Sequence, residues 1–176
     1  MLDSVIGCIL LDSDGNRIAA RYYGNLNKSG FTDYPSQRLF EEQLHNKGSR
    51  ISCKGEAEAF FVSDFTCLVR PIGDTFIYLV FYPSENELIL NNTINCVYDS
   101  LENVVSGHVS KKTLFESLDS VHLILDEVVD SSGVLFETDF SAVCQRAKMQ
   151  GSEGLEHTAF NQAFATAKEN IMRGFL

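Results

Sequence analysis

The hydrophobic period of this chain changes once, directly after Tyr82, from the spacing of strands to the spacing of helices. Before that point, short runs of β-branched and aromatic residues alternate with turn residues, which is typical of strands. After it, apolar residues recur every three or four positions along one helical stripe, at Leu90, Ile94, Val97, Leu101 and Val105. Strands followed by long amphipathic helices predict an α+β fold, with helices packed on an antiparallel sheet.

The first half of the chain predicts five strands and one helix. Residues 4–12 and 17–23 form two apolar runs joined by the turn residues 13–16, which indicates a β-hairpin. The first of these runs does not alternate, so we expect that strand to be buried on both faces. Residues 60–62, 65–70 and 75–82 predict three more strands, and the last is apolar enough to be central.

Between the hairpin and the third strand, residues 24–34 are rich in turn residues and predict a loop. A helix is expected from Pro35 to about Gly48, because proline favours the first turn and glycine favours the end. Its residues at helical spacing are Leu39, Phe40, Gln43 and Leu44.

The second half predicts two long helices and a shorter one. Ser84 and Glu87 have the spacing of a capping box for the first long helix. Ser110 is expected to cap the second, which ends at residues 130–133, and Thr138 is expected to open the short helix. The stripe of the second long helix is Leu114, Leu118, Val121, Leu125 and Val128, and that of the short helix is Phe140, Val143, Cys144 and Ala147. The predicted order is therefore β-β-α-β-β-β-α-α, followed by C-terminal helices.

We divide the chain into a domain of residues 1–148 and an extension of residues 149–176. Residues 150–154 have the composition of a linker, and a further apolar stripe at helical spacing follows them. That stripe either packs on its own domain or contacts a partner, and the pattern favours neither. The candidate partner-binding residues are Phe160, Phe164, Ile171, Phe175 and Leu176.

The chain has no motif that indicates catalysis. It lacks the nucleophile elbow, the P-loop and the dinucleotide-binding glycine pattern. Its four histidines occur singly, and its five cysteines lack the spacing of a zinc site. We therefore expect no catalytic residue, no cofactor and no metal, and we interpret the cysteines as buried small side chains. A cysteine-dependent hydrolase is the alternative from another class, and it would require one reactive thiol.

The negative charge is concentrated in one part of the chain. Residues 74–139 contain 12 acidic and two basic residues, and the remaining residues balance. A surface of this sign repels phosphate backbones, which argues against nucleic acid as a partner. No apolar run reaches the ~20 residues of a membrane span, and no basic leader precedes the first strand. We expect a cytoplasmic protein without a membrane span.

Several segments resemble the zeta subunits of coatomer, which belong with the adaptor small subunits and have a longin-like (SNARE-like) fold. They are residues 82–90, 95–101, 123–130 and 133–139, together with the hairpin and residues 167–171. Residues 24–57 resemble that family poorly. The small (sigma) subunits of clathrin adaptors, or other longin-type trafficking scaffolds, are the alternative. Sigma subunits typically carry a tryptophan in the second strand and stop after the two long helices, whereas this chain has no tryptophan and continues.

The resemblance implies a structural role in coat protein complex I. The direct partner would be the gamma subunit of coatomer, with the other coatomer subunits around it. A GTPase of the ADP-ribosylation-factor family would recruit the complex to Golgi membranes, an indirect contact, for transport back to the endoplasmic reticulum. In the clathrin adaptors a basic residue near Arg17 helps to bind acidic dileucine signals. We do not carry that activity over, and we interpret Arg17 as an exposed strand arginine.

Overall fold

The computed structural model describes residues 5–105 and 107–147. Its core is a five-stranded antiparallel sheet with the strand order β2-β1-β5-β4-β3. The strands are β1 (Val5–Asp12), β2 (Arg17–Tyr22), β3 (Glu58–Val62), β4 (Phe65–Ile72) and β5 (Thr75–Phe81). The helices are α1 (Leu26–Ser29), α2 (Tyr34–Gly48), α3 (Glu87–Val104), α4 (Lys111–Glu116) and α5 (Leu118–Val128). Residues 140–147 are also helical.

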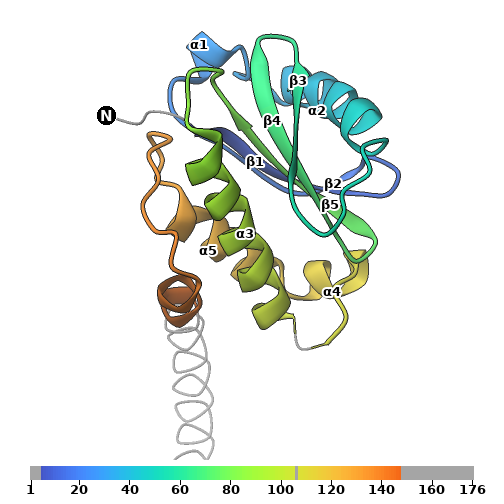
Figure 1. Ribbon diagram of the computed structural model, residues 1–176, viewed down its shortest axis with the longest axis vertical. Helices are drawn as coiled ribbons and strands as arrows, with labels where there is room; N and C mark the ends of the chain where they lie inside the picture. The colour runs from blue at the N-terminus through green and yellow to red at the C-terminus, as the bar shows by residue number, and fades with distance from the viewer. Residues whose placement is uncertain (1–4, 106, 148–176) are drawn as a thin grey trace, which may run out of the picture.

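The sheet separates two hydrophobic cores, because helices lie on both of its faces (Figure 1). Successive residues of β5 point to opposite faces, as the pleat requires. Leu79 and Phe81 join the core beneath α3 and α5, whereas Tyr78 and Val80 join the core beneath α2. Every residue of β1 is buried, which confirms the prediction for that strand. The central position of β5 is confirmed as well.

The apolar stripe of α3 is buried as predicted: Leu90, Ile94, Val97, Leu101 and Val105 are all at most 3% exposed. The predicted cap of that helix is wrong. Helix α3 begins at Glu87, and the side chain of Asn86 accepts a hydrogen bond from the backbone amide of Leu88, at 3.0 Å. Asparagine is as good a cap as serine, so the sequence offered two equivalent starts.

The second long helix is broken at Ser117, where α4 ends and α5 begins. Ser117 has φ −117° and ψ 27°, and its backbone amide closes a tighter turn onto the carbonyl of Leu114. The apolar stripe continues across the break, since Leu114 and Val121 are both fully buried. The stripe therefore predicted the burial but not the break. The predicted cap at Ser110 is confirmed, and Thr113 completes a capping box with it.

Three smaller predictions need correction. The segment 24–34 is not all loop, because Asn25 caps the short helix α1. Strand β4 continues through Pro71 to Ile72, since the neighbouring strand β3 pairs only as far as Val69 and leaves the proline without a ladder bond to make. The short C-terminal helix is capped by Asp139 rather than by Thr138.

In α2 the buried face is Phe40, Glu41, Leu44, His45 and Gly48. The predicted face differs, because Leu39 is 63% exposed and Gln43 is exposed too. A charged residue therefore occupies a position that the apolar pattern did not assign to the core.

Candidate interaction surfaces

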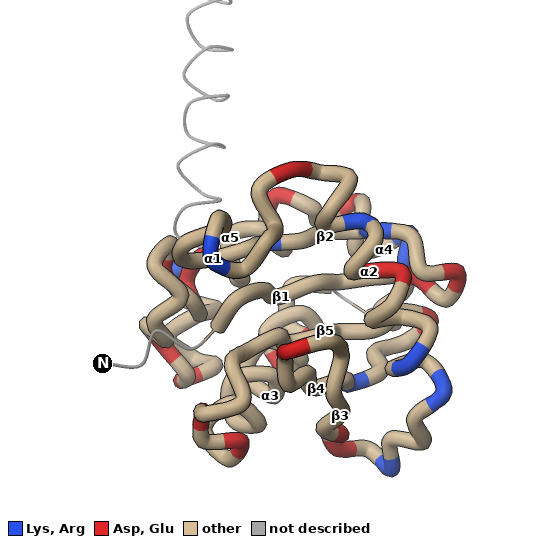
Figure 2. The backbone as a smooth tube through the Cα atoms, turned by 90° about the horizontal axis from the view of Figure 1, so that it is seen from above, with Lys and Arg blue, Asp and Glu red and all other residues tan. Residues whose placement is uncertain are grey.

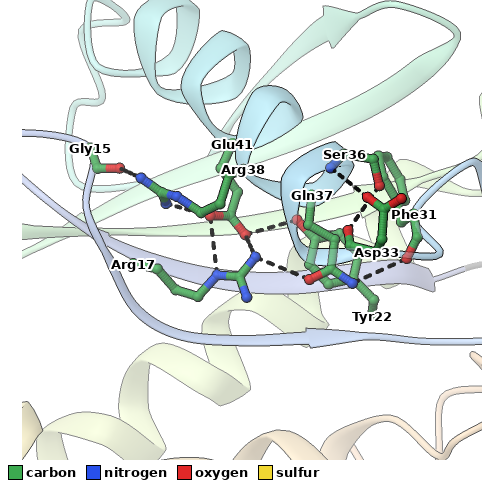
Figure 3. A network of polar contacts seen from close by, with 9 residues as sticks. All are labelled: Gly15, Arg17, Tyr22, Phe31, Asp33, Ser36, Gln37, Arg38 and Glu41. Carbon is green, nitrogen blue, oxygen red and sulfur yellow. Dashed lines mark hydrogen bonds and ion pairs between the residues drawn. The ribbon is translucent and has the colours of Figure 1, made fainter.

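The polar centre of the α2 side is the carboxylate of Glu41, which is completely buried. It accepts hydrogen bonds from three side chains on two elements (Figure 3). The distances are 2.6 Å from Nη1 of Arg38, 2.9 Å from the hydroxyl of Tyr22 and 3.1 Å from Nε of Arg17. A buried charge is tolerated only when it is paired and hydrogen-bonded in this way. Glu41 thus joins helix α2 to strand β2.

Arg17 is not the exposed strand arginine that we expected. Its side chain is only 20% exposed and forms an ion pair with Glu41. Its guanidinium also donates to Oε1 of Gln37 at 3.1 Å, and it lies 4.8 Å from the ring centroid of Tyr34. These contacts occupy the guanidinium within the chain itself. The hairpin therefore presents little free positive charge at this position.

Tyr22 remains a neutral hydrogen-bond donor in this network. Burial raises the pKa of its hydroxyl, and the negative charge of Glu41 raises it further.

A second buried polar residue, His45, links α2 to the sheet. Its Nδ1 lies 3.1 Å from the hydroxyl of Tyr78, and its Nε2 lies 3.2 Å from the carbonyl of Ser13. Because a carbonyl only accepts, Nε2 carries a hydrogen and donates it to Ser13.

The carboxylate of Asp12 holds the hairpin together and ties it to α4. Oδ1 accepts from the backbone amides of Asp14 and Asn16, and Oδ2 lies 2.6 Å from Nζ of Lys111. Burial alone would raise the pKa of Asp12, but these hydrogen bonds and the lysine outweigh it and lower the pKa to about 2. Asp12 is 1% exposed, whereas the side chain of Lys111 is 45% exposed, so only the carboxylate is shielded from solvent.

On the other side of the sheet, partly exposed ion pairs connect helix α5 to strand β2 and to the C-terminal helix of residues 140–147. Arg21 of β2 makes a bidentate pair with Asp126 of α5, at 2.7 and 2.8 Å. Arg146 pairs with Glu127 at 3.3 Å and with Glu137 at 3.2 Å. Three of the twelve acidic residues between 74 and 139, Asp126, Glu127 and Glu137, form these ion pairs, so part of the acidic excess is neutralised within the fold. Acidic residues occur on several sides of the molecule (Figure 2).

Large apolar side chains are exposed at several places in the described part of the chain. They are Tyr34, Leu39, Phe61, Leu88, Ile89, Phe115 and Phe136. Phe61 lies on β3, which is one of the two edge strands, and β2 is the other. Edge strands and exposed apolar residues are surfaces that another protein can cover.

The residues that the sequence suggested for partner binding lie outside the described residues. These are Phe160, Phe164, Ile171, Phe175 and Leu176.

The sequence did not indicate the buried polar residues Glu41, Asp12 and His45. For Glu41 and His45 a signal existed, because both stand next to Phe40 and Leu44 on an alternative helical face.

Four of the five cysteines are buried, as expected, whereas Cys53 is only half-buried. Burial raises the pKa of the Cys8 and Cys67 thiols to about 12 and that of Cys96 to about 11. Thiols with such pKa values are poor nucleophiles at neutral pH.

Among the residues that the structure describes, no three histidine, cysteine or acidic side chains come together as a metal site. Within residues 5–105 and 107–147, no helix has the length and apolar character to span a membrane.

The arrangement of sheet and helices also occurs in a chain of known structure. A chain of the AP-3 complex, in a homology model of the full-length complex in a stretched open conformation, superposes with a TM-score of 0.68. The alignment covers 88% of this chain and 98% of that chain, at 13% sequence identity, so the likeness concerns the fold. It confirms the longin-like α+β fold.

The clathrin adaptor complex small chain family matches residues 5–153, and this chain belongs to that family. Its sequence relatives include coatomer zeta subunits. Coatomer subunit zeta-2 of Mus musculus is 34% identical over 97% of this chain and 79% of its own length. Coatomer subunit zeta-1 of Homo sapiens is 32% identical, over 97% and 92%. Coatomer subunit zeta-3 of Arabidopsis thaliana is 30% identical, over 96% and 92%. The chain is therefore a coat-adaptor subunit and not an enzyme.

Proposed function

We propose that this chain is the zeta-type small subunit of a coatomer and that it binds the gamma subunit directly. The observation that carries the proposal is the full-length similarity to coatomer zeta subunits, at 30–34% identity over 96–97% of this chain. The other coatomer subunits would be neighbours in the same complex. The role is structural, since the small subunit keeps the large one in a defined shape.

The proposed setting is the cytoplasm and the surface of Golgi membranes and coated vesicles. A GTPase of the ADP-ribosylation-factor family recruits the complex there without contacting this chain. The transport step is the return of cargo from the Golgi to the endoplasmic reticulum. The internal pairing of Arg17 with Glu41 supports a scaffold rather than a reader of acidic signals, because the guanidinium is already occupied.

Native affinity purification with mass spectrometry tests the complex. Tagged chain expressed in its own cells should recover the large coatomer subunits in stoichiometric amounts. The second candidate is a sigma-type subunit of a clathrin adaptor, which the match to the clathrin adaptor small chain family favours. Recovery of clathrin adaptins instead of coatomer would establish that candidate and overturn the first.

We also propose that the domain of residues 1–148 is followed by an extension, residues 149–176, that binds the partner. The support is the apolar spacing of Phe160, Phe164 and Ile171, with Phe175 and Leu176 beyond it. Deleting residues 152–176 should weaken binding to the gamma subunit and leave the melting temperature nearly unchanged. A large fall in melting temperature would mean instead that the extension packs on its own domain.

A further inference from the structure

A groove of about 580 Å³ lies between the β1–β2 turn and helix α2. The turn contributes Asp14, Gly15 and Asn16, and the helix contributes a wall that runs from Pro35 to Asn46. Figure 1 shows α2 on the face of the sheet opposite to α3 and α5, and the turn at the end of strands β1 and β2. The helical wall of the groove therefore belongs to the α2 side of the sheet.

The groove has an excess of unneutralised negative charge. Asp14 and Glu42 line it, both are exposed, and neither forms an ion pair within the part of the chain that the structure describes. Arg38 also lines it, but its guanidinium is already used. Nη1 donates to the buried Glu41 at 2.6 Å, and Nη2 donates to the carbonyl of Gly15 at 3.4 Å (Figure 3).

His45 also lines the groove, but its two ring nitrogens already contact Tyr78 and the carbonyl of Ser13 and are not available to a ligand. The groove thus offers two carboxylates to a ligand. Its own cation, Arg38, is already paired with the buried Glu41.

The same groove has an apolar wall. Leu39 is 63% exposed on α2, and the ring of Pro35 is exposed one helical turn earlier. An exposed leucine at this position has no role in the core, because the buried face of α2 is the other one. An aliphatic side chain of a ligand could bury Leu39 while its cationic neighbour reaches Asp14 or Glu42.

We propose that this groove binds a short extended segment of a partner protein, one that carries an arginine or lysine beside an aliphatic residue. Charge complementarity identifies the occupant: two free carboxylates and a leucine require a cation and an apolar side chain. The proposal goes beyond the coat-subunit function and does not depend on it.

An NMR titration of the ¹⁵N-labelled full chain tests the proposal. The probe is a capped heptapeptide with the sequence glycine, serine, leucine, arginine, leucine, serine, glycine. Saturable shifts should be largest for the backbone amides of residues 14–16 and 38–46. Replacing both acids, Asp14→Asn with Glu42→Gln, should weaken binding by at least about tenfold, since each removes one carboxylate partner of the arginine. Leu39→Ser should weaken it as well.

The matched control is the pair Asp64→Asn with Glu56→Gln, which removes the same charge from exposed positions elsewhere. It should leave the affinity within about twofold of the unmodified chain. Thermal melts of both double variants should agree with that of the unmodified chain, because all four side chains are exposed. Three outcomes would overturn the proposal: no saturation at millimolar peptide, equal binding of a peptide with citrulline for arginine, or shifts confined to α3 and α5. Shifts confined to α3 and α5 would place basic ligands on the opposite side of the sheet.

Discussion

Glu41 is the residue at which most polar contacts of the α2 side converge. It is fully buried, and it forms ion pairs with two guanidiniums that are themselves only 20% and 29% exposed. Removing one partner of a buried ion pair leaves uncompensated charge in a poorly hydrated place, which costs more than the pair itself contributes. The contact between the hairpin and α2 therefore depends on this single carboxylate.

We expect Glu41→Gln to lower the free energy of unfolding by about 3 kcal/mol, the lower end of the range for breaking a buried pair. The lower end applies because Arg17 and Arg38 keep some access to water. Urea denaturation followed by circular dichroism measures it. The neighbouring variant Glu42→Gln is the control, because Glu42 is exposed and its loss should change stability by no more than about 0.5 kcal/mol. Equal effects of the two variants would contradict the role given to Glu41.

Asp12 gives a residue-scale prediction that depends on pH. Its folded-state pKa of about 2 lies below the value of 3.8 for an unperturbed aspartate. A lowered pKa stabilises the folded state above the unfolded pKa, and that contribution is lost as the pH falls toward the folded pKa. The difference corresponds to about 2 kcal/mol.

Asp12→Asn should therefore destabilise the chain by about 2 kcal/mol at pH 7. The gap between the two proteins should close as the pH is lowered from about 4 to about 2, because the unmodified chain then loses its advantage. Urea titrations at several pH values measure the gap. A gap that stays constant down to pH 2 would show that Lys111 and the turn amides do not stabilise the charged form.

At the scale of elements, periodicity predicted more of this fold than local signals did. The stripe of α3 follows from side-chain spacing, because burial of one face leaves a period in the sequence. The burial of β1 follows from the lack of alternation, because a strand buried on both faces is apolar throughout. Helix starts and breaks depend on single hydrogen bonds instead. Asn86 and Ser84 are both good caps, and nothing in the stripe of α4 and α5 marks the break at Ser117.

The polar site was harder to predict than the sheet, for a physical reason. Glu41 stands in the core only because Arg17 and Arg38 reach it from β2 and from its own helix. A pairing between residues 24 positions apart leaves no local pattern. The groove beside α2 has the same origin, since the β1–β2 turn and the helix meet only in the folded chain.

The cap of α3 yields the element-scale prediction. Asn86→Ala should lower the free energy of unfolding by about 1 kcal/mol, since the first turn loses its side-chain acceptor. Ser84→Ala is the matched comparison, and it should change stability by less than about 0.5 kcal/mol. Chemical denaturation of both variants measures the difference. The reverse order of effects would restore the capping box at Ser84 and Glu87.

For the whole molecule, the family match shows an adaptor small chain, and the sequence relatives include coatomer zeta subunits. A small subunit of this kind needs no cavity for chemistry, and the thiols with raised pKa values are consistent with that. Its function depends on surfaces: the edge strands, the exposed apolar side chains and the groove beside α2. These surfaces are present on the single chain, but they act only through contact with another protein.

The most direct test of the coatomer proposal is reconstitution with the gamma subunit of the same organism. The two chains are co-expressed, purified on a tag carried by the gamma subunit, and analysed by size-exclusion chromatography with light scattering. We predict one peak with the mass of a 1:1 complex. Separate elution of the two chains, with complex formation when the large chain of a clathrin adaptor replaces gamma, would contradict it.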